Sequence, residues 1–227
     1  MILYIDTSSA ISVLALKKDK KIYQRKIHQK TNISGVIIES VKEMLIEANL
    51  KKKEIKIISY NQGPGNFTSL RVALTYIKAI GFYLNTPIVS LNSFQILALS
   101  VPDNEREKPL IVAIDAKMNE IYWARYEKYA YVFLADNIYN LTSIDNFYEI
   151  LESEENKEII LIKNYNFVTN QKKNKFISNE IIADIDNIDL TKIFDVIEFQ
   201  IKNNYIENVH KSSLLYLRDN IADVKHE

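Results

Sequence analysis

Two short polar motifs in the first seventy residues carry groups that could hold a phosphate. Asp6-Thr7-Ser8-Ser9 follows an apolar run, and its hydroxyl and N–H groups could bind a phosphate or a metal-bound water. Gly63-Pro64-Gly65-Asn66-Phe67-Thr68 joins an expected strand to an expected helix, so its amides could bind an anion. In both motifs, local turn and capping chemistry is the simpler interpretation, because Asp, Asn, Ser and Thr also satisfy nearby backbone groups.

Several common catalytic devices are missing from the sequence. No Gly-Lys-Ser/Thr follows Gly65, and no third glycine follows at dinucleotide spacing, so neither a P-loop nor a Rossmann fingerprint is present. The three histidines, His28, His210 and His226, share no helical face at metal-ligand spacing, and there is no cysteine. We therefore expect no metal, no cofactor, no catalytic triad and no thiol chemistry.

The composition is that of an ordinary globular protein, but its charge is divided. Of 227 residues, 47% are apolar and 26% charged, with a net charge of zero. Residues 1–100 hold 14 Lys and Arg against 6 Asp and Glu, whereas residues 101–227 hold 15 against 23. The opposite signs suit two lobes that dock, or a basic half that meets a partner such as nucleic acid.

Neither a signal peptide nor a membrane span is expected. The apolar residues at the start have no basic region before them, and Asp6 follows at once. No apolar run approaches the roughly 18 residues of a membrane span. Together with the lack of cysteine, this predicts a cytoplasmic protein.

The first hundred residues predict three strands followed by alternating helices and strands. Strands are expected at Ile2–Ile5, Val13–Leu16, Ile22–His28, Ile57–Asn61 and Ile88–Ser90. Helices are expected from an N-cap at Ser34 to Ala48, from Phe67 to Leu84, and from a cap at Ser93 to Ser100. This order favours an α/β layer built on a mixed sheet.

A polar segment at residues 101–109 is typical of a linker and divides the chain into domains at 1–103 and 104–227. After it, Leu110–Asp115 repeats the opening pattern, an apolar strand that ends in Asp, which suggests a duplicated fold. Residues 164–190 show no clear pattern. Elsewhere we expect strands at Ile121–Tyr126, Tyr131–Tyr139 and Glu158–Ile162, and helices at Ile144–Leu151 and Thr191–Lys202.

The expected helix at Phe67–Leu84 is apolar on two faces. One stripe consists of Leu70, Leu74, Ile77 and Leu84, and a second of Val72, Tyr76, Ile80 and Tyr83. Such a helix is buried on both faces, or buried on one and covered by a partner on the other. The second stripe is our candidate partner interface, because tyrosine is enriched in interface cores.

Four segments carry family motifs: Ile2-Leu3-Tyr4-Ile5-Asp6-Thr7-Ser8, Gly63–Arg71, Asp115–Tyr122 and Tyr216-Leu217-Arg218. They resemble the TsaB (YeaZ) family of bacterial tRNA threonylcarbamoyladenosine biosynthesis proteins, whose signature is Gly-Pro-Gly-Ser-Phe-Thr-Gly-x-Arg. The resemblance is strong over residues 1–126 and returns at 213–222. The positions that it matches are Asp6, Thr7, Gly63, Pro64, Gly65, Phe67, Thr68, Arg71, Lys78, Asp115, Glu120, Tyr216 and Arg218.

Five positions depart from the family pattern. Asn66 replaces Ser, Ser69 replaces Gly, and Lys117 replaces Arg in the third segment. Leu214 stands where Pro is usual, and Ile33 stands before Ser34 where many relatives have His. If the His of the relatives touches the partner, that contact is changed in this chain.

The resemblance implies an actin-like, sugar-kinase-like (ASKHA, ribonuclease-H-like) α/β fold of two lobes, the second shortened. It also implies a non-catalytic subunit that pairs with the paralog TsaD, which transfers threonylcarbamoyl to the tRNA adenosine beside the anticodon. The ATPase TsaE joins them, a homodimer through the same helices is an alternative state, and tRNA is met at most indirectly. The matched positions are then scaffold, with no catalytic, cofactor or metal residue among them.

Two features of the residues agree with a scaffold. All four glycines lie at or before residue 81, whereas an ATP-using relative needs glycine loops in its second lobe. The first helix also lacks the pair of histidines that the metal site of the paralog needs. The alternative hypothesis is a small-molecule kinase of the same fold that uses Asp6 and Asp115 around ATP–Mg. A metallopeptidase rests on fold analogy alone and lacks ligands.

Overall fold

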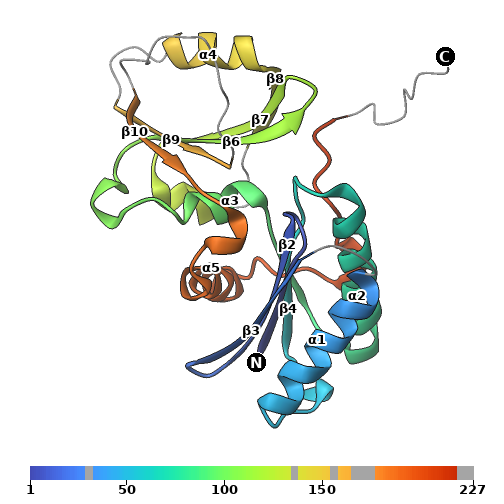
Figure 1. Cartoon of the computed structure of the whole chain (residues 1–227). Helices are drawn as coiled ribbons and strands as arrows, with labels where there is room; N and C mark the ends of the chain where they lie inside the picture. The colour runs from blue at the N-terminus through green and yellow to red at the C-terminus, as the bar shows by residue number, and fades with distance from the viewer. Residues whose placement is uncertain (29–32, 134–137, 154–157, 165–176, 219–227) are drawn as a thin grey trace, which may run out of the picture.

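The computed structural model describes residues 1–28, 33–133, 138–153, 158–164 and 177–218, and it contains two five-stranded mixed sheets (Figure 1). The first sheet has the strand order β3-β2-β1-β4-β5. Its half of the chain comprises β1 (Ile2–Asp6), β2 (Ile11–Lys18), β3 (Lys21–His28), α1 (Ile33–Glu47), η1 (Lys52–Glu54), β4 (Ile57–Asn61), α2 (Phe67–Leu84), β5 (Ile88–Leu91), α3 (Ser93–Ala98) and η2 (Asp103–Glu105).

The second sheet has the order β10-β9-β6-β7-β8. Its half comprises β6 (Leu110–Lys117), β7 (Glu120–Tyr126), η3 (Tyr129–Phe133), β8 (Tyr139–Ser143), α4 (Ile144–Ser153), β9 (Ile159–Lys163), β10 (Ile177–Ile182), η4 (Ile185–Asn187), α5 (Leu190–Lys202) and η5 (Val209–Lys211). No helix in the described ranges is both long and apolar enough to cross a membrane.

The two sheets repeat one topology, which confirms the duplicated fold. In each, the first strand pairs antiparallel with the second and parallel with the fourth. In each, the second strand also pairs antiparallel with the third, and the fourth pairs parallel with the fifth. The apolar run ending in Asp is therefore the central strand of both sheets, β1 in the first and β6 in the second.

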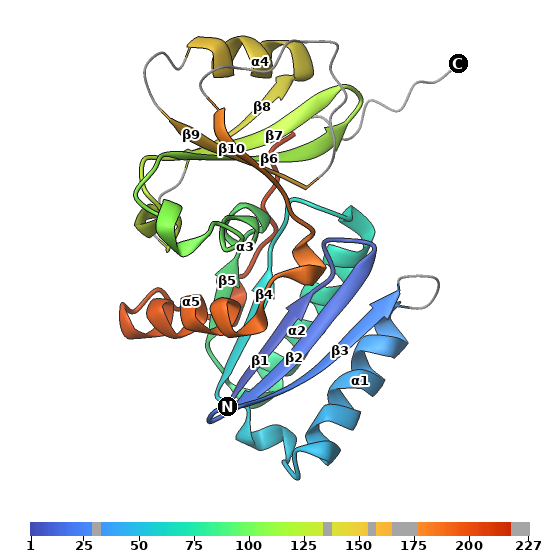
Figure 2. The same ribbon diagram turned by 60° about the vertical axis from the view of Figure 1, so that its left-hand side comes forward.

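Helices cover both faces of each sheet (Figures 1 and 2). On one face of the first sheet, Leu3 and Ile5 pack with the buried residues of α1 and α2. On the opposite face, Tyr4 belongs to a central core that α3, α5 and the second sheet share. The outer face of the second sheet packs on Phe147 and Leu151 of α4. Alternate residues of the central strands thus enter different cores, as a pleated strand requires.

The end of the chain returns to the first sheet. Ile88 and Glu207 exchange backbone hydrogen bonds of 2.9 and 2.8 Å, which extends the first sheet beyond β5. Val209 and Leu214 are buried in the core beneath α1 and α2. The predicted boundary at residue 103 separates the two sheets, but Glu207, Val209 and Leu214 lie against the first one.

Several local predictions need correction. A strand was expected at Tyr131–Tyr139, but residues 129–133 form the 3-10 helix η3, and β8 begins only at Tyr139; residues 134–137 lie outside the described ranges. Tyr129 and Val132 are both buried, and this spacing of three suits a 3-10 turn. In the unassigned segment 164–190, the structure places β10 parallel to β9 and the short helix η4; residues 165–176 are not described.

Two helix caps also differ from expectation. Ser34 lies inside α1, which begins at Ile33. Asn92, not Ser93, caps α3: its side chain accepts from the N–H of Gln95 at 2.9 Å, and Gln95 Oε1 accepts from the N–H of Asn92 at 3.1 Å. A reciprocal pair satisfies two otherwise unpaired donors, which is the advantage of a capping box. The expected linker at 101–109 contains η2, and its Val101 is buried.

Candidate functional site

Asp6 ends β1 inside a closed hydrogen-bond network. Its side chain is 2% exposed. Oδ1 accepts from the N–H and Oγ of Ser8, at 2.8 and 2.7 Å, and Oδ2 accepts from Tyr4 Oη and Asn61 Nδ2, both at 3.0 Å. Burial raises the pKa of Asp6, and these four donors oppose that rise. Both carboxylate oxygens are therefore used within the protein.

The glycine loop packs directly on this turn. Gly63 has a φ of +102°, and its N–H donates to Asn61 Oδ1 at 2.9 Å. A Cβ on Gly65 would lie 2.4 Å from the carbonyl oxygen of Ser8, which itself accepts from the N–H of Asn66 at 2.7 Å. Only glycine allows that approach. The loop is a structural joint between β1, β4 and α2.

The beginning of α2 supplies its own cap. Asn66 Oδ1 accepts from the N–H of Ser69 at 3.2 Å, and Asn66 O accepts from Leu70. The capping interpretation of this loop is confirmed, with Asn66 as the cap. Both departures within this glycine loop signature, Asn66 and Ser69, take part in this bond. Thr68 is exposed beside them.

Sequence reasoning missed Ser93 and Tyr4 as members of this network. Ser93 donates through its N–H to Gly63 O at 2.9 Å and through Oγ to Pro64 O at 2.7 Å. Ser93 therefore fixes the loop to α3, although it is not the cap. The sequence did contain one signal for this network. Asp6 ends β1 and Asn61 ends β4, and polar residues at the ends of neighbouring parallel strands lie close together.

Arg218, in the C-terminal segment, ties the second lobe to this joint. It pairs with Glu120 and donates to the carbonyl oxygen of Ala116 at 3.3 Å. Four residues earlier, Leu214 is buried in the core of the first lobe. The third and fourth family segments thus meet in space, 98 residues apart in sequence.

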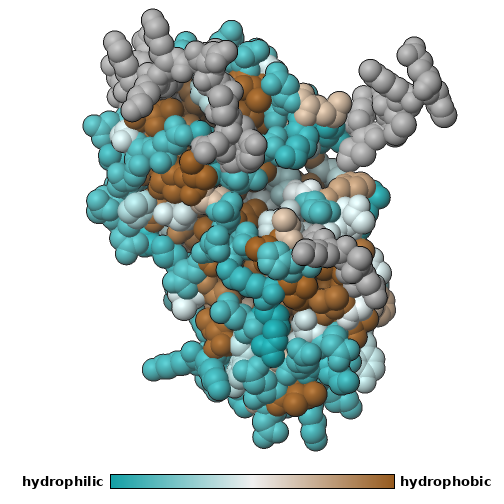
Figure 3. Space-filling model, viewed as in Figure 1, coloured by the Kyte–Doolittle hydropathy of each residue, from teal (hydrophilic) through white to brown (hydrophobic). Residues whose placement is uncertain are grey.

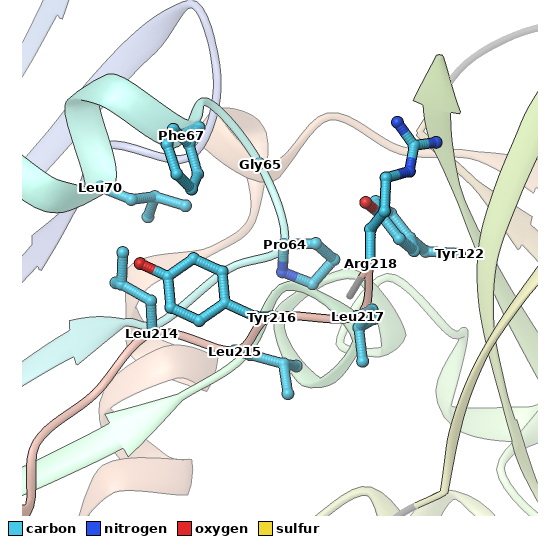
Figure 4. Close-up of a pocket in the computed structure, with 10 residues that line it drawn as sticks. All are labelled: Pro64, Gly65, Phe67, Leu70, Tyr122, Leu214, Leu215, Tyr216, Leu217 and Arg218. Atoms are coloured by element: carbon cyan, nitrogen blue, oxygen red, sulfur yellow. The ribbon is translucent and has the colours of Figure 1, made fainter. Parts of the chain in front are cut away.

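Tyr216 of the same segment lies on an aromatic cluster at the start of α2. Its ring meets that of Phe67 edge-on, with centroids 5.9 Å apart. The guanidinium carbon of Arg71 lies 3.7 Å from the centre of the Phe67 ring. Phe67 and Tyr216, together with Pro64 and Leu70, line a cavity of about 230 Å³ (Figure 4). The matched positions of the second and last segments therefore lie in direct contact.

Asp115 stands at the equivalent strand end in the second lobe, but in a more open setting. Its side chain is 19% exposed. Oδ1 accepts from the N–H of Lys117 at 2.8 Å, and Oδ2 pairs with Lys117 Nζ at 2.5 Å. Ser8, Gly65, Asp115 and Lys117 all line a cleft of about 650 Å³ between the lobes. The structure brings the first and third segments to the same cleft, while the carboxylate of Asp6 lies beneath it.

The second stripe of α2 is divided. Ile80 is 7% exposed and packs in the core of its own lobe, so its assignment to the partner interface is corrected. The segment near Val209, which covers this end of α2, is distant in sequence. Val72 and Tyr76 are half-buried, and burial raises the pKa of Tyr76 to about 12. Tyr83 is 72% exposed. Lys78 is also half-buried on this helix.

Metal-ligating side chains do not gather in the described residues. Among them, no group of three or more His, Asp or Glu side chains could hold a metal ion. The side-chain partners of Asp6 are neutral donors, and the side chain of Asp115 pairs with Lys117. Neither carboxylate is arranged with a second acidic ligand as a magnesium site prefers.

The repeated mixed sheets define an α/β protein of the actin-like, two-lobed class. Two solved Pseudomonas aeruginosa proteins share this fold, each at 17% identity. One, described as similar to peptidase YeaZ, has a TM-score of 0.74 and covers 96% of this chain and 99% of its own. The other, described as YeaZ, has a TM-score of 0.70 and covers 95% and 99%.

Sequence comparison gives the family. The model of the TsaD family, described as tRNA N6-adenosine threonylcarbamoyltransferase, matches residues 26–215. The chain belongs to this family, and its relatives identify it as a TsaB (YeaZ) type member. The tRNA threonylcarbamoyladenosine biosynthesis protein TsaB of Buchnera aphidicola subsp. Acyrthosiphon pisum is 32% identical over 56% of this chain and 58% of its own. TsaB of Escherichia coli is 24% identical over 56% of this chain and 55% of its own. The chain spans less than three fifths of the length of these relatives.

Proposed function

We propose that this protein is a non-catalytic subunit of the assembly that forms threonylcarbamoyladenosine on tRNA, at the adenosine adjacent to the anticodon. The observation that carries the proposal is the joint at Asp6. In that joint, the polar groups of the best-matched motifs bond to one another. A carboxylate with four internal donors serves as a structural anchor. Relatives that match this chain in sequence are named as tRNA threonylcarbamoyladenosine biosynthesis proteins.

We further propose that TsaD is the direct partner and that TsaE joins the pair. The face of α1 and α2 turned away from the first sheet supports a contact of this kind. Ile38 and Ile46 on α1, and Phe82 and Tyr83 on α2, are each more than half exposed. Figure 3 shows hydrophobic residues at the surface beside α1. Exposed apolar side chains on one helical layer favour a protein partner. A homodimer through the same layer would compete with TsaD.

The kinase alternative gains no support from the geometry of Asp6. A kinase of this fold needs a carboxylate that can reach a phosphate-bound metal, and both oxygens of Asp6 are already occupied. Calorimetric titration of the isolated protein with ATP–Mg tests this point. We expect no binding, and tight binding by the lone chain would favour the kinase.

Depletion of the protein in its parent cell tests the main proposal. We expect threonylcarbamoyladenosine to disappear from bulk tRNA, as measured by mass spectrometry of nucleosides. Re-expression of the wild-type chain should restore it. If the modified nucleoside persists after depletion, the proposed function is wrong.

A pair of charge substitutions tests the interface. Tyr83→Asp should leave the thermal melt unchanged, because the side chain is exposed, and should reduce co-purification with TsaD. Tyr76→Asp would place a charge on a half-buried position, so we expect a lower melting temperature as well as weaker binding. Ile138→Asp in the second lobe, at a side chain 80% exposed, is the matched control. A folded Tyr83→Asp variant that binds TsaD at wild-type strength would remove Tyr83 from the interface.

A further inference from the structure

Seven lysines gather at the end of the first lobe that points away from the second lobe. They come from the β2–β3 hairpin and from the segment around η1, and they are Lys18, Lys20, Lys21, Lys51, Lys52, Lys53 and Lys56. Only two acidic residues, Asp19 and Glu54, occur in these two segments. Figures 1 and 2 both show the hairpin and η1 at this end, on either side of the start of β1. We call these seven side chains the lysine end.

Strand pairing fixes part of the lysine end as a row. Lys18 is opposite Lys21 across the hairpin, and β2 is paired with β1. On the other side of β1, the N–H of Lys56 donates to Met1 O at 3.0 Å, just before β4. Adjacent strands are about 4.8 Å apart, so this row across four strands is roughly 14 Å long. Strand pairing at this end of the first sheet holds the row in place.

The lysines have no acidic partners within the described part of the chain. Six are exposed and Lys18 is half-exposed, and no ion pair is formed by any of them there. Lys21 Nζ lies 4.6 Å from the centre of the Tyr23 ring, which leaves its charge intact. Glu54 is partly used, because its Oε2 accepts from the N–H of Lys51 at 2.8 Å. The positive charge is therefore available to an outside anion.

The character of the surface favours a phosphate backbone over an acidic protein. A protein interface needs a fully buried apolar centre, but none of the large exposed hydrophobic residues lies within 18–21 or 51–56. Figure 3 shows hydrophilic side chains projecting from this end, around one small hydrophobic patch. Binding to nucleic acid phosphates needs only closely spaced cations, because affinity comes from counterion release.

We propose that the lysine end binds the phosphate backbone of a folded RNA, and that in the cell this RNA is the tRNA being modified. The identity of the RNA as tRNA rests on the proposed function, whereas the backbone contact rests on the lysines alone. This contact is direct, in place of the indirect one that the family resemblance implies. The RNA would then bind at the end of the first lobe that is farthest from the interlobe cleft.

Fluorescence anisotropy of the full chain with a labelled tRNA transcript, at several salt concentrations, tests the contact. The variant Lys52→Gln/Lys53→Gln keeps Lys51 and Glu54, which pair through the backbone at the start of η1. The matched control is Lys202→Gln/Lys211→Gln, because both lysines are exposed and lie outside the lysine end. Thermal melts check that all three proteins are folded.

We expect the wild-type affinity to fall steeply with salt. The Lys52→Gln/Lys53→Gln variant should bind at least about tenfold more weakly at 0.1 M salt, with the slope of log K against log salt reduced by about 2. The control variant should match the wild type. Equal binding and equal slopes for both variants and the wild type would overturn the proposal. So would binding to a polyglutamate of similar charge without binding to tRNA, which would indicate an acidic protein partner.

The outcome is separable from that of the proposed function, because the assay measures no modification. If depletion leaves threonylcarbamoyladenosine in place while the lysine end still binds tRNA in vitro, the surface stands and the function fails. If depletion removes the nucleoside while the Lys52→Gln/Lys53→Gln variant binds as the wild type does, the function stands and the surface is refuted.

Discussion

The two lobes share one strand topology but differ at the residue that ends the central strand. Asp6 in the first lobe is 2% exposed and accepts four hydrogen bonds. Asp115 in the second is 19% exposed and is held by the side chain and N–H of its near neighbour Lys117. The same local pattern thus makes a sealed anchor in one lobe and an open turn in the other.

An asparagine bonds to the aspartate in both lobes, through the amide nitrogen in the first lobe and through the amide oxygen in the second. Asn61 ends β4 and donates Nδ2 to the carboxylate of Asp6 at 3.0 Å. Asn164 follows β9, and its Oδ1 accepts from the backbone N–H of Asp115 at 3.0 Å. In the first lobe the amide stabilises the charge of the side chain, and in the second it fixes the backbone. The duplication therefore kept the residue types at the strand ends while their contacts diverged.

Removing each carboxylate should give the largest contrast between the lobes. Asp6→Ala would leave the donors of Ser8 and Tyr4 buried without this acceptor and would leave Asn61 Nδ2 only its serine partners. We therefore expect a loss of about 4 kcal/mol in the free energy of unfolding. Asp115→Ala removes a partly exposed ion pair and should cost under about 1 kcal/mol. Urea unfolding of the two variants measures both values. Equal losses of unfolding free energy in the two variants would contradict the proposed difference between Asp6 and Asp115.

The close approach of the glycine loop to the Asp6 turn should give the next largest effect. Gly65→Ala would place a Cβ 2.4 Å from the backbone oxygen of Ser8, so the loop must move, at a cost of about 2 kcal/mol. Gly81→Ala is a suitable control, because its Cβ would lie 3.0 Å from a methyl group of Val209 that can shift. Urea unfolding should rank Gly65→Ala as the more harmful, and the reverse order would be evidence against a rigid joint.

The contact between the lobes through Arg218 should contribute less. Its pair with Glu120 is about a third or less exposed on either side, and Arg218→Ala should lower the free energy of unfolding by about 1 kcal/mol. Because the pair joins segments from opposite lobes, we also expect faster backbone amide exchange at residues 214–217. Arg125→Ala, which removes an ion pair within the second lobe, is the control. Unchanged exchange in the Arg218 variant would argue against a tie between the lobes.

Much of the fold was predictable because its elements carry clear local signals. The strands ending at Asp6 and Asn61 and the helix from Phe67 to Leu84 agree with the sequence pattern. The repeat of Ile2–Asp6 at Leu110–Asp115 correctly indicated duplication.

What could not be predicted depends on contacts between residues distant in sequence. Ile80 was grouped with Tyr83 in one stripe, but Ile80 packs with Ile77 in a core that also contains the distant Val209, whereas Tyr83 is 72% exposed. The strand β10 carries the polar run Ser178-Asn179-Glu180 in its middle and is defined by pairing with β9. The four bonds to Asp6 include Tyr4 and Asn61, and Ser93 completes the joint from α3. No local pattern marks such a set.

The smallest expected effect concerns the charge of Asp6 and its dependence on pH. Burial raises the pKa of Asp6 above the value of about 3.9 in an unfolded chain. The folded state therefore binds the proton more tightly than the unfolded state does. The stabilisation that results is fully present below pH 3.9 and is lost as pH rises through the folded pKa.

Subtracting the unfolding free energy of Asp6→Asn, whose amide does not titrate, isolates this contribution. We expect the wild type to lose stability relative to the variant from about pH 4 upward, and the difference to level off above the folded pKa. The carboxyl carbon shift of Asp6, followed by NMR, should titrate above pH 4 in the folded protein. If the relative stability of the wild type instead falls as pH is lowered, the four donors outweigh burial. The anchor would then be a stabilised carboxylate, and Asp6 would hold its joint through charge-assisted hydrogen bonds.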